Sequence, residues 1–170
     1  KNISNEITIW DFVEFQDENI VNIIQRKNLL ARYKWDSDRF SLHKRILQPI
    51  AANLDFVVIV ASAMNPKFQP WFIERYIILA ESCNIPILIC ISKSDLQIIK
   101  NPILEYYTEQ LGISIVYTSS ETGQWIEELK EKIFWKNVVF VGKSWVGKSS
   151  LINTILQNHV TKTSSVSEKW

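Results

Sequence analysis

The sequence predicts an α/β domain with a parallel sheet, preceded by a short all-β segment. Continuous runs of apolar, β-branched residues alternate with segments of helical apolar spacing, which is the pattern of βαβ units. These strand-like runs lie at 55–62, 85–92, 113–120 and 137–142. Before residue 49 the pattern differs, because residues 3–15 and 20–33 are expected as short strands. The first alternates apolar and polar side chains with a period near two, and the second carries β-branched residues with Asn and charged residues between them.

The helices are expected between and after these strands. Pro70 suits the first turn of a helix over 70–83, and Gly112 suits the end of a helix over 101–112. The third helix carries Glu-to-Lys pairs at helical spacing, and the fourth opens with Gly147-Lys148-Ser149. Those two helices are expected at 123–134 and 147–158. The mixed polar stretch 34–48 predicts a linker.

Composition restricts the function only weakly. The chain has 170 residues, 46% of them apolar, and a formal net charge of +1, so neither nucleic acid nor membrane is indicated. No apolar run reaches membrane-spanning length. Cys83 and Cys90 are expected as buried thiols, and His43 and His159 have no nearby ligand partners in the sequence. We therefore expect a cytoplasmic protein with no membrane contact.

A phosphate-binding loop is predicted after the last strand. The sequence GKSWVGKS fits G-x-x-x-x-G-K-[ST], and it follows a strand and opens a helix, as that motif requires. The loop amides and the helix N-terminus favour phosphate, Lys148 would contact the β- and γ-phosphates, and Ser149 would bind Mg²⁺. The predicted nucleotide-contacting residues are Gly142, Lys143, Ser144, Trp145, Val146, Gly147, Lys148, Ser149 and Ser150. A glycine-containing turn at a strand–helix junction is the alternative.

Trp145 occupies a position where phosphate loops usually carry a small residue. If the backbone there needs a positive φ, a tryptophan is strained. Its ring is otherwise free to project over the nucleotide as a lid.

A base-reading loop is predicted at Ser92, Lys93, Ser94 and Asp95, at the end of the strand over 85–92. The Asp95 carboxylate accepts from both N1–H and the N2 amine of guanine, a donor pair that adenine lacks. Lys93 would pack along the base and ribose. Ser92 replaces the usual Asn, so we expect the loss of an amide that ties loops together. A solvated turn is the alternative for this motif taken alone.

A second base loop is predicted at Ser119, Ser120 and Glu121, between a strand and a helix. It is similar to the Ser-Ala-Lys loop of GTPases, in which a backbone N–H contacts guanine O6, although Glu121 replaces Lys. All these loops follow parallel strands, and ligands in open α/β sheets bind at the carboxyl ends of strands. We therefore expect the loops to meet at one edge of the sheet.

The loop order, with the phosphate loop last, resembles the circularly permuted GTPases, and within them the ribosome small subunit-dependent GTPase A family. RKNLLAR at 26–32 resembles the end of that family's OB domain, and SVSEK at 165–169 resembles the approach to switch I. The GTPase domain is matched in order by PIAANLDFVVIVAS, FQPWFIERYIILAE, ISKSDL, TSSETG and VFVGKSWVGKSSLIN. The resemblance implies a partial OB segment and linker at 1–47 and an incomplete permuted GTPase domain at 48–170.

The resemblance also implies a function: GTP hydrolysis to GDP and phosphate with Mg²⁺, in late maturation of the small (30S) ribosomal subunit. It implies contact with ribosomal RNA through the OB domain, and a monomer. The switch regions are expected after Trp170, together with a zinc domain, so Zn²⁺ is expected only outside this chain. Alone, the chain is expected to hydrolyse GTP weakly or not at all.

Two other functions stay open. A P-loop ATPase or kinase would share the phosphate loop but not the use of Asp95 for base choice. A non-catalytic ribosomal RNA-binding module would hold its nucleotide only as a structural ligand. Basic and aromatic residues are interleaved as OB folds use them, with a solvated strand face as the alternative: Arg26, Lys27, Arg32, Tyr33, Lys34, Trp35, Arg39, Phe40, Lys44 and Arg45.

Overall fold

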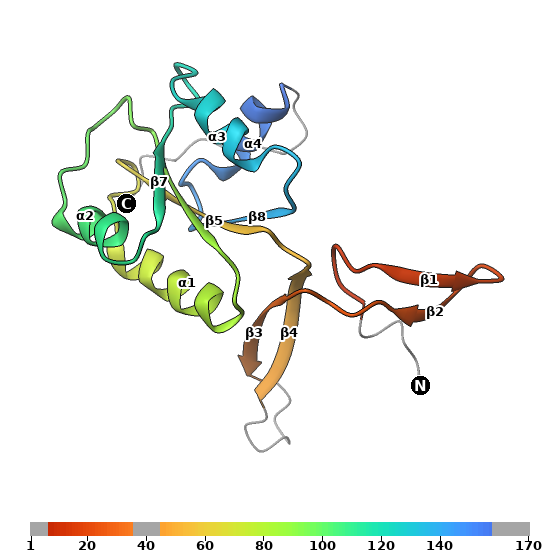
Figure 1. Ribbon diagram of the computed structural model, residues 1–170. Helices are drawn as coiled ribbons and strands as arrows, with labels where there is room; N and C mark the ends of the chain where they lie inside the picture. Colours follow the sequence, from red (N-terminus) through yellow and green to blue (C-terminus); the bar gives the residue numbers. More distant parts are fainter. Residues whose placement is uncertain (1–6, 36–44, 158–170) are drawn as a thin grey trace.

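The computed structural model describes residues 7–35 and 45–157. A parallel α/β unit forms most of this part, and two antiparallel strand pairs precede it (Figure 1). The pairs consist of β1 (Val13–Gln16) with β2 (Asn19–Ile23), and β3 (Leu29–Trp35) with β4 (Arg45–Ala52). The strands of the α/β unit are β5 (Phe56–Ser62), β6 (Ile87–Ser92), β7 (Ser114–Tyr117) and β8 (Val138–Val141).

The four strands of the α/β unit form one parallel sheet in the order β7-β6-β5-β8. Helices α1 (Pro70–Ser82) and α2 (Pro102–Glu109) cover one face. Helices α3 (Ile126–Ile133) and α4 (Lys148–Leu156) cover the other (Figure 1). The predicted α/β class with a parallel sheet is confirmed.

Two buried clusters hold the layers together. Val57 and Ile59 of β5 point toward α1 and α2, whereas Val58 and Val60 point toward α3 and α4. Every residue of β6 is buried, as expected of a central strand with helices on both faces. The apolar runs in the sequence therefore predicted the inner strands correctly.

Local chemistry sets where the helices begin. α2 starts at Pro102, and the Asn101 side chain accepts a hydrogen bond from the Ile103 N–H at 3.1 Å, which satisfies one of the free amides of the first turn. α1 also starts with a proline but has no side-chain cap. The predicted helix over 101–112 ends earlier, at Glu109, and the chain then turns at Gly112 with φ +64°.

The predicted linker over 34–48 is wrong at both of its described ends. β3 continues to Trp35, and residues from Arg45 onward form β4. Pro49 sits inside β4 opposite Ala31, where the register shifts. A proline cannot donate to a strand ladder, and an irregular register accommodates that loss. Residues 36–44 lie outside the described part.

Among the described residues, two ion pairs involve the N-terminal segment: one lies within it, and the other joins it to the start of the α/β unit. Arg26 binds both carboxylate oxygens of Asp11, at 2.7 and 2.8 Å, and this contact holds the pKa of Asp11 below its usual value. Lys27 contacts Asp55 at 3.0 Å, and Asp55 also accepts from the Asn137 N–H at 2.9 Å, which is the larger cause of its own lowered pKa. Arg26 and Lys27 thus have structural partners. The side chains of residues 33–46, which include the other predicted basic and aromatic residues after Arg32, are not described.

Within the described residues, no helix is long and apolar enough to cross a bilayer. Those residues also contain no cluster of His, Cys, Asp and Glu that could hold a metal ion. His43, His159 and the stretch predicted to approach switch I fall outside them.

Candidate nucleotide site

The loops that the sequence singles out meet at the carboxyl edge of the sheet. The Ser94 N–H, after β6, donates to the Thr118 carbonyl, after β7, at 3.1 Å. The Lys93 amine donates to the carbonyl of Trp145, after β8, at 2.9 Å. The two base-reading loops and the phosphate loop are therefore linked by direct hydrogen bonds.

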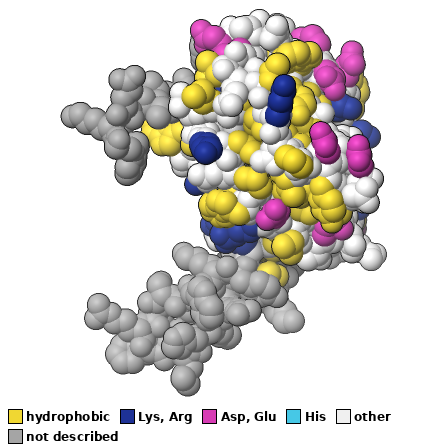
Figure 2. All heavy atoms as spheres, turned by 90° about the vertical axis from the view of Figure 1, so that its left-hand side faces the viewer, with side chains coloured by type: hydrophobic (Ala, Val, Ile, Leu, Met, Phe, Trp, Pro, Cys, Tyr) yellow, Lys and Arg dark blue, Asp and Glu magenta, His cyan; other side chains and the backbone are white. Residues whose placement is uncertain are grey.

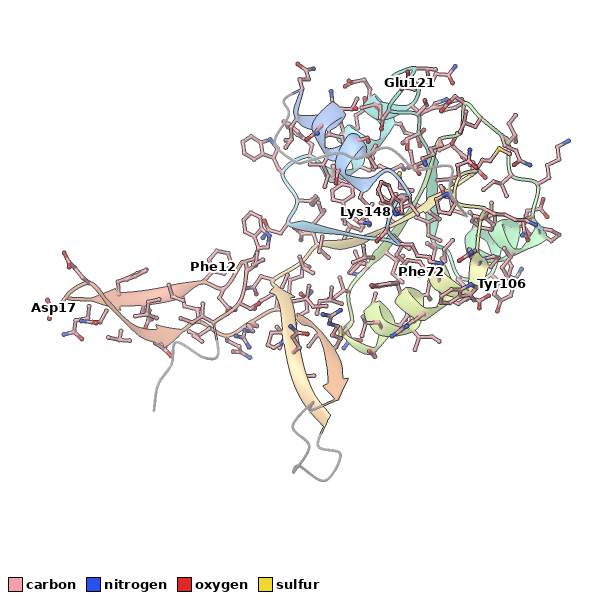
Figure 3. All side chains as sticks on the ribbon, turned by 180° about the vertical axis from the view of Figure 1, so that it is seen from behind. Phe12, Asp17, Phe72, Tyr106, Glu121 and Lys148 are labelled. Atoms are coloured by element: carbon pink, nitrogen blue, oxygen red, sulfur yellow. The ribbon has the colours of Figure 1, made fainter. Side chains whose placement is uncertain are left out.

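Lys148 is held over the phosphate loop at the start of α4 (Figure 3). Its amine donates to the carbonyl oxygens of Gly142 at 2.8 Å and Lys143 at 2.6 Å. Burial lowers the pKa of Lys148, because a desolvated ammonium loses its hydration. Ser149 and Ser150 follow, half-buried, in the first turn of α4. The site therefore combines a cation with a helix N-terminus, the combination that favours phosphate.

The other phosphate-loop side chains point in different directions. Trp145 has φ +70° and is 45% exposed. Its backbone therefore adopts the positive φ that is strained for a tryptophan. The Lys143 amine donates to Gln69 at 2.7 Å and lies 5.2 Å from the Trp71 ring centre. The Lys143 side chain is thus directed toward the start of α1.

Ser92 corrects one expectation. We expected the Asn-to-Ser replacement to remove a tie between loops, but the buried Ser92 hydroxyl donates to the Val146 carbonyl at 2.5 Å. It also lies 3.2 Å from the Ala61 carbonyl. A hydroxyl has one proton, so the shorter contact is the principal one. Serine therefore keeps β6 attached to the phosphate loop.

Replacing Ser92 with alanine is expected to lower the free energy of unfolding by about 1–2 kcal/mol, because the buried Val146 carbonyl loses its donor. Chemical denaturation measures this loss. The matched control is Ser82→Ala, since the Ser82 hydroxyl donates to the Leu79 carbonyl from an exposed position. Equal losses in the two variants would contradict the role given to Ser92.

Gly142 is required by the close approach of two backbones. A Cβ at this position would lie 2.5 Å from the Val60 carbonyl oxygen and 3.1 Å from a Val146 methyl group. A backbone oxygen cannot move aside cheaply, so the start of the phosphate loop would have to shift.

We expect Gly142→Ala to destabilise the fold by about 2–3 kcal/mol. The comparison variant is Gly123→Ala, where φ is +75° but no atom lies within 4 Å of a new Cβ, so backbone strain alone costs about 1 kcal/mol. Thermal unfolding of both variants measures which one loses more stability. A larger loss of stability for Gly123→Ala than for Gly142→Ala would contradict the close packing described at Gly142.

The base-reading side chains differ in exposure. Lys93 has φ +57° and is half-buried, and this burial lowers its pKa, partly offset by the nearby Asp95 charge. Asp95 is exposed, so its carboxylate is accessible to a ligand. Lys93 also contacts the Asn65 carbonyl in the loop after β5. Sequence reasoning missed that loop, although its position after the strand over 55–62 places it at the same edge.

The second base loop is shaped by Ser119. This fully buried residue donates its N–H to Gln124 at 3.2 Å, and its hydroxyl accepts from the Thr122 N–H at 3.1 Å. Ser120 is half-buried, and Glu121 stands exposed at the outer rim of the loop (Figure 3). Nearby, Cys90 is buried in β6, and burial raises its thiol pKa to about 12, as expected of a structural thiol.

A parallel sheet whose phosphate-loop strand comes last in the chain, after two loops in the positions of base readers, defines the circularly permuted GTPase class. Two solved structures support this class. The solved structure of YjeQ from Thermotoga maritima is 33% identical, with a TM-score of 0.62, and the match covers 88% of this chain and 51% of that one. For YloQ, described as a circularly permuted GTPase, the values are 27% identity, a TM-score of 0.57, and coverage of 85% and 48%.

The family model for the RsgA GTPase matches residues 23–170. Relatives named "Small ribosomal subunit biogenesis GTPase RsgA" occur in Chlorobaculum parvum and Borreliella burgdorferi strain ZS7. The Chlorobaculum protein is 34% identical, and the match covers 98% of this chain and 56% of that protein. The Borreliella protein is 38% identical, and the match covers 86% of this chain and 46% of that protein. The chain belongs to the RsgA GTPase family, and it spans about half the length of these relatives.

Proposed function

We propose that the protein containing this chain binds GTP and hydrolyses it to GDP and phosphate during biogenesis of the small ribosomal subunit. The observation that carries the nucleotide part is the hydrogen-bonded meeting of the loops after β6, β7 and β8. The names of its relatives support the ribosomal part. Action on the small subunit would place the protein in the cytoplasm.

Each loop has a proposed role in binding. Asp95 accepts from the guanine N1–H and N2 amine, and the Lys93 stem covers the base. Ser92 and Ser94 fix that loop, and residues 119–121 approach guanine O6 through a backbone N–H. The amides of residues 142–147 and the start of α4 surround the phosphates. With Lys148 already at this position, the donors present fit a nucleoside triphosphate.

Mg²⁺ fits the same site. This ion keeps several waters and binds to substrate phosphates with few protein ligands, and Ser149 supplies a hydroxyl in the first turn of α4. When bound, Mg²⁺ would neutralise charge developing on the phosphates during hydrolysis. The Lys148 ammonium would stabilise the same charge from the protein side. We assign hydrolysis to the whole protein.

The domain assignment is also a proposal. Residues 1–47 would belong to a partial OB fold that contacts ribosomal RNA, and residues 48–170 to the GTPase domain of a monomer. β4 runs across this boundary, so the two parts share a continuous strand.

The proposal is tested with the full-length protein, by measuring phosphate release from GTP with and without purified small ribosomal subunits. We expect subunits to accelerate release, and Lys148→Ala to abolish it under both conditions. Release that is unchanged by subunits would reject the ribosomal role. Equal release from ATP would reject guanine specificity.

A further inference from the structure

A second concave site lies beside the outer edge of β7, next to the first base-reading loop. Its volume is about 300 Å³, and its lining residues come from β7, the loop after β6, and α3: Ser94, Ile98, Ile115, Tyr117, Trp125 and Glu128. β7 is an end strand of the sheet. The site is therefore open to a molecule that approaches along a free strand edge.

The β7 edge is short, but it lacks the side chains that usually protect an end strand. Its sequence Ser-Ile-Val-Tyr contains neither a charged residue nor proline. Thr118 donates its N–H to Ile91 of β6, and backbone groups alternate in direction along a strand. The N–H and C=O groups of Ile115 and Tyr117 therefore face outward, at the two β7 residues that line the site.

Exposed apolar side chains surround this edge. Ile98 is 75% exposed and Trp125 is 50% exposed. Trp125 also has φ +54°, at a helix start that it does not cap with its side chain. Figure 2, which views the molecule from the left-hand side of Figure 1, shows hydrophobic side chains gathered on this face, with both acidic and basic side chains beside them.

The charge of the site selects the partner. Glu128 is the only charged residue in its lining, and it makes no ion pair with any of the described residues. An apolar site with an acidic group beside a strand edge suits an extended peptide that carries an apolar side chain next to a cation. A polyanion such as RNA would be repelled by the same carboxylate.

We propose that an extended, basic segment of a partner protein pairs with the outer edge of β7, inserts an apolar side chain between Ile98 and Trp125, and places a cation against Glu128. A peptide bound at this site would contact the first base-reading loop, because Ser94 belongs to that loop and also lines the site. This inference does not depend on the nucleotide that the neighbouring loops bind.

The test uses ¹⁵N-labelled chain titrated with the peptide Lys-Val-Leu-Val-Lys and with its counterpart Glu-Val-Leu-Val-Glu, followed by NMR. We expect the basic peptide to shift the amide signals of β7, Ser94 and Trp125 and to bind at least about threefold more tightly than the acidic one. Glu128→Lys should reverse that preference, a result that mere disruption of the fold cannot give.

Ile98→Asp should abolish binding, whereas Ile78→Asp on α1, where the side chain is 70% exposed, should leave it unchanged. Equal affinity for the two peptides would overturn the proposal. So would shifts that map away from β7, or the absence of shifts in a spectrum that shows a folded chain. Concentration-dependent broadening at β7 without peptide would assign the edge to a second copy instead.

Discussion

Lys148→Ala is expected to weaken GTP binding about 30- to 1,000-fold. Truncating one member of a desolvated, hydrogen-bonded charge pair costs about 2–4 kcal/mol, and each ~1.4 kcal/mol is a factor of ten. The Lys148 amine is placed by the carbonyls of Gly142 and Lys143 at 2.8 and 2.6 Å, so its position over the loop is set before a ligand arrives. Isothermal titration calorimetry with GTP and Mg²⁺ measures the loss.

Two comparisons make this result specific. Lys132→Ala removes a cation from an exposed position on α3 and should leave the affinity unchanged. GMP, which lacks the β- and γ-phosphates, should bind Lys148→Ala and the unaltered chain nearly equally. A similar loss for GMP would mean that the substitution damages the site as a whole.

Asp95→Asn is expected to lower GTP affinity about 30-fold or more, because guanine loses hydrogen bonds to a charged acceptor, worth about 2–3 kcal/mol in total. Xanthosine triphosphate should gain affinity in the same variant. Xanthine carries a carbonyl where guanine carries the N2 amine, and the Asn amide can donate to it. Competition of both nucleotides against a fluorescent GDP measures this exchange of preference.

The exposed position of Asp95 keeps this substitution from disturbing the core. Asp17→Asn is the matched control, since Asp17 lies at the exposed β1–β2 turn, far from the site (Figure 3). It should change neither nucleotide's affinity. If Asp95→Asn weakened both nucleotides equally, base recognition would have to be assigned to other residues.

The sequence predicted the sheet well because its strands are buried on both faces. Such strands appear as unbroken apolar runs, as Val57–Ala61 and Ile87–Ile91 do, and parallel connection follows from the helices between them. The edge position of the candidate loops follows from the same topology. β4 was missed because its first residues belong to a mixed polar stretch, and because a proline inside a strand is usually read as a break.

The contacts between loops were beyond sequence reasoning. Nothing in the pattern S-K-S-D shows that the Ser92 hydroxyl reaches Val146, because that contact depends on where two strands end relative to one another. The same holds for Lys93 and Asn65, which are brought together only by the paired registers of β5 and β6. Trp145 was identified as unusual from the motif, but the sign of its φ required coordinates.

The central claim is that the loops after β6, β7 and β8 bind one guanine nucleotide together. Equilibrium titration of the chain with GTP, GDP and ATP in the presence of Mg²⁺ tests it most directly. We predict that GTP and GDP bind at least about a hundredfold more tightly than ATP, since adenine leaves the Asp95 carboxylate without its two donors. Equal affinity for ATP and GTP, or no binding of either, would contradict the claim.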